Sequence, residues 1–476
     1  MPTNSVVSDV LDLPLRLVEE GGQPARVHAG LRAAILEGRL RAGLRLPSSR
    51  ALAQQLGVRR NAVVTAYEHL LADGLTEARV GDGTYVAARL PGAPAQPPIP
   101  ASVAAAPAPR GPFALGQTHP DPDLLAWIAR IMRRQLAATD PAHFAYGDPR
   151  GSAELRAAIA SHLAATRGVV RDPAQILVTS GTQQAVRLCA DVVLRPGEQV
   201  WMEDPGYPAA RRILEAAGAR LVPVPVDAAG LEVAEGRRRA PDARLAYVTP
   251  SHQFPTGVTM SMERRIALLD WARQAGAWVI EDDYDSEFRF AGPPLTALAG
   301  IDPEGRVIYV GTFSKTLFPG LRMGYAVLPS TLVEGMVAAR AVSDRFPPSL
   351  LDGAVAELMA GGGFARHVRR MRGRYRAARD LVAAVLLEAS GGLLRVVVPD
   401  QGLHLLAWLP EEAPPGTAAA LRIAAGVEGW LISETRLEQG GPDGFVIGYS
   451  GHAPAALRGA AERLGAAARQ WAAQAG

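Results

Sequence analysis

A run of prolines divides this chain and limits how it can fold. Eight prolines, separated mostly by alanines, stand between residues 88 and 112. Because proline fixes its φ angle and lacks a backbone N–H, this stretch cannot hold a helix. We expect a semi-rigid, extended spacer over residues 88–112, on the order of 70 Å long at about 3.1 Å per residue. A chain of 476 residues is too long to fold around one compact core. With the spacer at residues 88–112, we therefore predict a multidomain protein with one unit over residues 14–87 and another over residues 113–476.

The remaining composition indicates the cellular compartment that we expect. Cys189 is the single cysteine, so an internal disulfide is excluded. The first residues resemble no signal peptide, and no apolar run reaches the length of a membrane span. We therefore expect a cytoplasmic protein without a membrane partner, and we predict no metal site.

Positive charge gathers in the first unit. Between residues 26 and 60, eight arginines face one acid, Glu37. Apolar spacing predicts helices over about 24–38, 48–56 and 60–73, the last with Val63, Tyr67, Leu70 and Leu71 on one face. Residues 76–80 and 84–87 then predict a hairpin. The order of helix, turn, helix and hairpin indicates a winged helix-turn-helix, although any three-helix unit with surface arginines has a similar pattern.

Four short motifs in this unit carry a resemblance to a known family. They are LPSSR at 46–50, LGVRRN at 56–61, AYEHL at 66–70 and GDGTYV at 81–86. Together they resemble the winged helix-turn-helix of GntR-type bacterial transcription regulators. The resemblance implies binding to double-stranded operator DNA. The implied contacts come from Ser49, Arg50, Arg60, Asn61, Asp82 and Gly83.

Strands and helices alternate in the second unit. Strands are expected over 176–179, 200–203, 245–249, 278–281, 307–310 and 324–328, with helices such as 154–165 and 262–274 between them. This alternation predicts an α/β fold with a mainly parallel sheet covered on both faces. Ligands in such sheets lie at the carboxyl ends of the strands.

One lysine stands among 49 arginines, and it follows one of those strands. Biased codon use explains why arginine replaces lysine elsewhere, but it does not explain why Lys315 remains. A guanidinium cannot condense with an aldehyde, whereas a primary amine forms a Schiff base. Thr312, Ser314 and Arg322 flank this lysine and supply two hydroxyls and a guanidinium for a phosphate.

Other strand ends offer complementary groups. Residues 180–184 (SGTQQ) open a helix whose backbone N–H groups can hold a phosphate. Residues 281–284 (EDDY) offer a carboxylate to a pyridine nitrogen, although a solvated turn or helix cap has the same pattern. Tyr207 can stack on a pyridine ring, and a tyrosine there is also common in ordinary packing.

Taken together, these motifs resemble fold type I pyridoxal 5′-phosphate enzymes of the aminotransferase class over most of residues 113–476. The resemblance implies Lys315 as the Schiff-base lysine, Asp282 as partner of the pyridine nitrogen, and Tyr284 near the cofactor's phenolic oxygen. It implies Tyr207 as the stacking ring and Tyr146 as a residue that reaches the neighbouring subunit's phosphate in a dimer. The implied phosphate contacts are Thr182, Gln183, Thr312, Ser314 and Arg322.

Two positions depart from the aminotransferase pattern. Phe254 stands where these enzymes usually carry Asn before Pro-Thr-Gly. Residues 445–452 hold no arginine for a substrate carboxylate, and Arg436 is the nearest alternative for an effector carboxylate. Both departures argue against efficient transamination, while cofactor binding is unaffected.

The head, the spacer and the body, with HQFPTG at 252–257, resemble the MocR subfamily of bacterial regulators. The resemblance implies a transcription regulator that senses pyridoxal phosphate or a small amine through the body. It also implies a homodimer, often head-to-tail. An active aminotransferase with an appended head and a repressor with a cofactor-free scaffold remain as alternatives. The sequence does not select an effector, and γ-aminobutyrate, taurine and pyridoxal phosphate itself all remain open.

Overall fold

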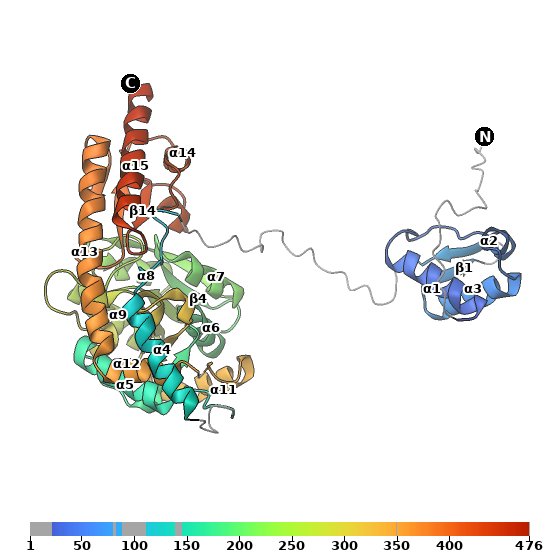
Figure 1. Ribbon diagram of the computed structural model, residues 1–476, viewed down its shortest axis with the longest axis horizontal. Coiled ribbons are helices and arrows are strands. Elements are labelled where there is room, and N and C mark those ends of the chain that lie inside the picture. The colour runs from blue at the N-terminus through green and yellow to red at the C-terminus, as the bar shows by residue number, and fades with distance from the viewer. Residues whose placement is uncertain (1–20, 80–81, 88–110, 139–144, 349, 476) are drawn as a thin grey trace. The chain divides into compact units, whose positions relative to one another are not determined.

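The computed structural model describes residues 21–79, 82–87, 111–138, 145–348 and 350–475, in two compact units (Figure 1). The units lie on either side of the proline-rich stretch in the sequence. Residues 14–20 and 88–110, which belong to the predicted head and spacer, lie outside the described residues. In the described part of the chain, no helix has both the length and the apolar character needed to cross a membrane.

The N-terminal unit is the winged helix that the sequence predicts. Its elements are α1 (Gln23–Leu36), α2 (Ser49–Leu56), α3 (Arg60–Ala72), β1 (Thr76–Arg79) and β2 (Gly83–Val86). The two strands pair antiparallel, with Thr76 opposite Val86. The helices and the hairpin enclose one apolar core.

Local chemistry sets the bounds of the second helix in this unit. The Ser48 hydroxyl accepts a hydrogen bond from the Ala51 backbone N–H at 3.2 Å, which caps the start of α2. Gly57 ends the helix with φ 65°, a conformation that favours glycine. One prediction for α3 is wrong: Leu71 is 46% exposed, and Ala66 is buried in the core instead. Helical spacing puts Leu71 at the margin of the buried stripe, where its side chain stays half exposed.

The C-terminal unit is built on an eight-stranded sheet of order β3-β10-β9-β8-β7-β4-β5-β6. Pairs β4·β5, β4·β7, β7·β8 and β8·β9 are parallel, so the expected mainly parallel sheet is confirmed. Its strands are β3 (Ile176–Thr179), β4 (Gln199–Asp204), β5 (Arg220–Asp227), β6 (Gly230–Leu231), β7 (Leu245–Val248), β8 (Trp278–Asp283), β9 (Val307–Thr312) and β10 (Gly324–Val327).

Helices cover both faces of this sheet, as Figure 1 shows. Alternate residues of one strand enter different cores: Val279 belongs to one apolar cluster and Ile280 to the other. The helices are α4 (Pro122–Ala137), α5 (Ala153–Arg167), α6 (Thr182–Val193), α7 (Pro208–Ala216), α8 (Val233–Arg239), α9 (Met262–Ala275), α10 (Phe313–Thr316), α11 (Val333–Ser343), α12 (Asp352–Ala360), α13 (Gly363–Ser390), α14 (Thr417–Ala425) and α15 (Pro454–Ala475).

A second, smaller sheet was not among the sequence predictions. It is antiparallel, of order β11-β12-β14-β13, and α13 and α15 lie side by side next to it (Figure 1). Its strands are β11 (Arg395–Val397), β12 (His404–Trp408), β13 (Trp430–Leu431) and β14 (Gly444–Gly448). Phe113 bridges to Gly448, so the chain enters the unit along β14. Residues 115–116 thereby reach the carboxyl ends of the large sheet.

Candidate functional site

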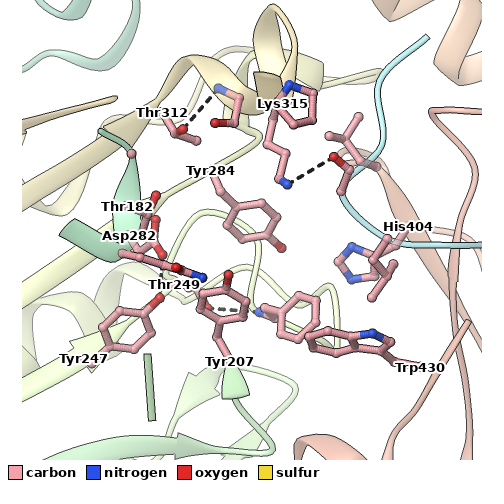
Figure 2. A pocket seen from close by; sticks show the side chains of 18 of the residues that line it. Thr182, Tyr207, Tyr247, Thr249, Asp282, Tyr284, Thr312, Lys315, His404 and Trp430 are labelled. Carbon is pink, nitrogen blue, oxygen red and sulfur yellow. Dashed lines mark hydrogen bonds between the residues drawn. The ribbon is translucent and has the colours of Figure 1, made fainter. Parts of the chain in front are cut away.

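A cavity of about 270 Å³ lies at the carboxyl ends of the central strands, where the sequence places its candidate residues. Figure 2 shows side chains from the large sheet, from α6 and from the small sheet converging on it. Most of the predicted cofactor residues line this one cavity: Thr182, Gln183, Tyr207, Asp282, Tyr284, Thr312, Ser314, Lys315 and Arg322.

Lys315 lies on α10, which begins directly after β9. The Thr312 hydroxyl accepts a hydrogen bond from the Ser314 backbone N–H at 3.1 Å and caps this short helix. The lysine Nζ donates to the Gly116 carbonyl at 3.4 Å. A Cβ at Gly116 would stand 2.6 Å from that amine, so the glycine keeps its space open. Burial lowers the pKa of Lys315, which favours the neutral, nucleophilic amine.

Asp282 is the penultimate residue of β8 and is 4% exposed. The Tyr247 hydroxyl donates to its Oδ2 at 2.5 Å, while its Oδ1 is buried without a hydrogen-bond partner among the described residues. Burial raises the pKa of Asp282 to about 7, and the hydrogen bond from Tyr247 partly opposes that rise. A buried carboxyl oxygen without a partner is costly, so the site fits a ligand that brings a donor to it, such as a protonated ring nitrogen.

The N-terminus of α6 forms one wall of the cavity. Gly181 precedes the helix with φ 112°, and Thr182 is its first residue. Arg322 also lines the cavity and holds φ 52°, a left-handed conformation that is uncommon for residues other than glycine. Helix N–H groups, hydroxyls and a guanidinium together suit a phosphate.

Two tyrosines line the middle of the cavity. The Tyr284 hydroxyl donates to the His252 carbonyl at 3.0 Å, and the His252 ring in turn pairs with Asp285 at 2.9 Å. The Tyr207 ring meets Phe254 edge-on, with ring centroids 5.6 Å apart. An aromatic ring, that of Phe254, therefore lies where aminotransferases usually carry asparagine.

Two candidates lie away from the cavity. Arg436 is absent from its lining and donates to the Gly440 and Pro442 carbonyls, so the structure does not bring it to the site. Tyr146 is 74% exposed, with the Arg345 guanidinium 3.9 Å from its ring centroid.

The candidate DNA contacts gather on the surface of the winged helix. Arg50, Arg60 and Asn61 are exposed, and Arg60 Nε donates to the partly buried Ser49 hydroxyl at 3.5 Å. At the wing, exposed Asp82 accepts a hydrogen bond from the Tyr85 hydroxyl at 2.7 Å, and Gly83 has φ 126°. Arginine side chains on an exposed helix surface suit contact with a phosphate backbone.

Sequence reasoning missed several residues of the cavity. Tyr247 lies in strand β7, whose four residues are all buried, so no alternation of polar and apolar residues marks it for a polar role. His404 and Trp430 come from the unpredicted small sheet, and Leu115 from the segment beside β14. A tyrosine within an apolar strand, next to the strand's last residue, was the one available signal for Tyr247.

Comparisons with protein families divide the chain as its structure does. Residues 24–86 match the family described as bacterial regulatory proteins, gntR family. Residues 113–437 match aminotransferase class I and II.

Curated relatives span nearly the whole chain. The probable rhizopine catabolism regulatory protein MocR of Rhizobium meliloti is 37% identical over 91% of this chain and 91% of its own. The HTH-type pyridoxine biosynthesis transcriptional regulator PdxR of Corynebacterium glutamicum is 33% identical over 94% of this chain and 96% of its own.

Among solved structures, LysN, the α-aminoadipate aminotransferase of Thermus thermophilus complexed with N-(5′-phosphopyridoxyl)-L-leucine, superposes with a TM-score of 0.69. It is 28% identical and covers 76% of this chain and 92% of its own. Kynurenine aminotransferase of Pyrococcus horikoshii, solved with PMP, also gives a TM-score of 0.69 at 26% identity, over 75% of this chain and 90% of its own.

Proposed function

The chain belongs to the MocR-type group of GntR-family transcription regulators, and on that premise we propose that its C-terminal unit binds pyridoxal 5′-phosphate through Lys315. The observation that carries this proposal is one cavity that joins a buried amine, Lys315, to a buried carboxyl, Asp282, whose Oδ1 has no partner among the described residues. Solved structures with the same fold hold PMP or a phosphopyridoxyl adduct.

Each part of the cofactor has a matching group in the cavity. Asp282 would hold the ring nitrogen and Tyr207 the ring face, while Tyr284 would lie near the phenolic oxygen. The start of α6 with Thr182, Gln183, Thr312, Ser314 and Arg322 would hold the phosphate. The bound cofactor supplies an electrophilic carbon to amines. Lys315 would supply the amine, and burial lowers its pKa, which favours the unprotonated form.

The regulatory response would follow from a difference in the effector's affinity for two arrangements of the protein. The N-terminal unit binds double-stranded DNA, and a ligand that favours one arrangement of heads and bodies over another shifts DNA binding by that difference. We propose a homodimer, head-to-tail, with an amine or the cofactor itself as effector. The exposed Tyr146 would then reach the neighbouring subunit's phosphate.

The first test uses the single lysine. We expect borohydride reduction of the purified, cofactor-loaded chain to leave one phosphopyridoxyl group, because a reduced bond to an amine is stable. Peptide mapping should place it on Lys315. A group found elsewhere, or a colourless protein in excess pyridoxal phosphate, would refute the proposal and favour a cofactor-free scaffold. Repeated turnover of an amino donor would favour the aminotransferase alternative.

A second test concerns the head. We expect Arg60→Ala to weaken binding to the DNA upstream of the protein's own gene, and to reduce the slope of log affinity against log salt by about 1 if Arg60 contacts a phosphate. Fluorescence anisotropy at several salt concentrations measures both quantities. Arg220→Ala removes the same charge from an exposed position in the C-terminal unit and serves as the control. Equal behaviour of the two variants would exclude Arg60 from the DNA contacts.

A further inference from the structure

The half of the cavity remote from α6 is aromatic and apolar. Figure 2 shows His404 and Trp430 on the side away from Thr182 and Asp282. Phe254 meets the Trp430 ring at 5.8 Å between centroids and an angle of 90°. Phe254 also lies edge-on to the rings of Tyr207 and His404. We call the set Leu115, Tyr207, Phe254, Leu403, His404 and Trp430 the aromatic wall.

This wall offers no cation to an anionic ligand. Among the described residues that line the cavity, the Lys and Arg side chains are Lys315, whose amine is proposed to bond the cofactor, and Arg322. A Cβ built on Gly181 at the α6 end would lie 3.9 Å from Arg322 Nη1. His404 Nε2 donates to the Pro255 carbonyl at 2.9 Å, because a carbonyl can only accept. Burial lowers the pKa of His404 to about 3, so its ring stays neutral near pH 7.

Several polar groups around the wall already have partners, although His252 Nε2 is buried without one among the described residues. Asp285, buried behind the wall, pairs with His252. The Tyr449 hydroxyl, after β14, donates to the Gly402 carbonyl at 2.7 Å, and the Ser450 hydroxyl donates to the Gln117 carbonyl at 2.6 Å. An additional carboxylate placed here would lose its hydration and gain no cationic partner from the wall residues that the structure describes.

We propose that the effector of this regulator is a primary amine without a carboxylate or other anionic group, whose apolar or aromatic body packs against Phe254 and Trp430. The inference rests on the proposed function, because the amine must meet the cofactor at Lys315. It gives a single cause to two departures from the aminotransferase pattern. Phe254 in place of asparagine builds the wall, and the absent arginine near β14 is not needed.

Matched amines test this on the cofactor-loaded, full-length protein. The probes are 2-phenylethylamine against L-phenylalanine, and n-butylamine against γ-aminobutyrate. Binding is followed by the cofactor's absorbance, corrected for free pyridoxal phosphate with the same amine, and by calorimetry. We expect each carboxylate-free amine to bind at least about tenfold more tightly than its partner, since an unpaired buried charge is costly. Equal or tighter binding of the amino acids would overturn the inference.

Variants of the wall locate the effect. Trp430→Ala should weaken 2-phenylethylamine by roughly 3- to 10-fold, the range of an aromatic pair, and Trp430→Phe should restore most of it. Trp471→Ala, on α15 and outside the cavity lining, should leave the amine affinity unchanged. Unchanged affinity in Trp430→Ala would also overturn the inference.

The two proposals fail in different ways. Wild-type protein without a cofactor band would overturn the proposed function and this inference with it. Protein that carries the cofactor on Lys315 but prefers L-phenylalanine would overturn this inference alone.

Discussion

Replacing Lys315 with alanine is expected to lower the affinity for pyridoxal phosphate by at least about 100-fold and to remove the absorbance band of the lysine-bound cofactor. The phosphate groups at α6 and the Asp282 carboxyl remain in this variant, so weak binding persists. The amine that is proposed to bond the cofactor is lost, and the chain has no second lysine to replace it. Equilibrium dialysis and absorbance titration of wild type and variant measure the difference.

Lys315→Arg is the matched control for charge. Arginine keeps a cation in the cavity but cannot condense with an aldehyde, so this variant should also lack the band. Together the two variants separate the covalent role of Lys315 from its electrostatic one. A band that survives in Lys315→Arg, or cofactor affinity that is unchanged in Lys315→Ala, would show that another group holds the cofactor.

Much of this site could be predicted because its residues stand at strand ends. Buried strands are readable as short apolar runs, and the carboxyl ends of parallel strands meet at one edge of a sheet. Asp282 is the penultimate residue of β8 and Lys315 follows β9, and these strands pair in parallel, so their side chains are expected at the same edge of the sheet. Thr182 and Tyr207 were placed by the same reasoning, after β3 and β4.

The aromatic wall could not be predicted in this way. His404 lies on the five-residue strand β12 and Trp430 on the two-residue strand β13, which are too short to give a clear strand pattern. Leu115 lies in an irregular segment. Their approach to Lys315 depends on how the small sheet docks on the large one, which is a matter of tertiary packing. Arg436 was predicted only from its nearness in sequence to residues 445–452, and it does not line the cavity.

The buried ion pair next to Asp282 could not be predicted from the sequence either. Arg167, at the end of α5, lies 2.8 Å from the Asp283 carboxylate, and both side chains are nearly fully buried. The Tyr309 hydroxyl donates to the same carboxylate at 2.7 Å, and Arg167 donates to the Ser251 hydroxyl at 2.6 Å. Burial alone would lower the pKa of Arg167, but Asp283 raises it above its ordinary value. This pair joins α5 to β8 next to Asp282, the carboxyl that is proposed to hold the cofactor's ring nitrogen.

We therefore expect Arg167→Ala to reduce the free energy of unfolding of the C-terminal unit by about 3–5 kcal/mol, because Asp283 is left buried without its partner. Tryptophan fluorescence during urea unfolding measures this unit alone, since all seven tryptophans lie between residues 127 and 471. The measurement belongs on cofactor-free protein, so that weaker ligand binding does not add to the loss.

Arg187→Ala, which breaks an exposed pair with Asp191, should cost far less. Arg167→Met combined with Asp283→Leu should recover part of the loss by removing both charges, whereas a double variant as unstable as Arg167→Ala would mean that lost packing, rather than the unpaired carboxylate, causes it.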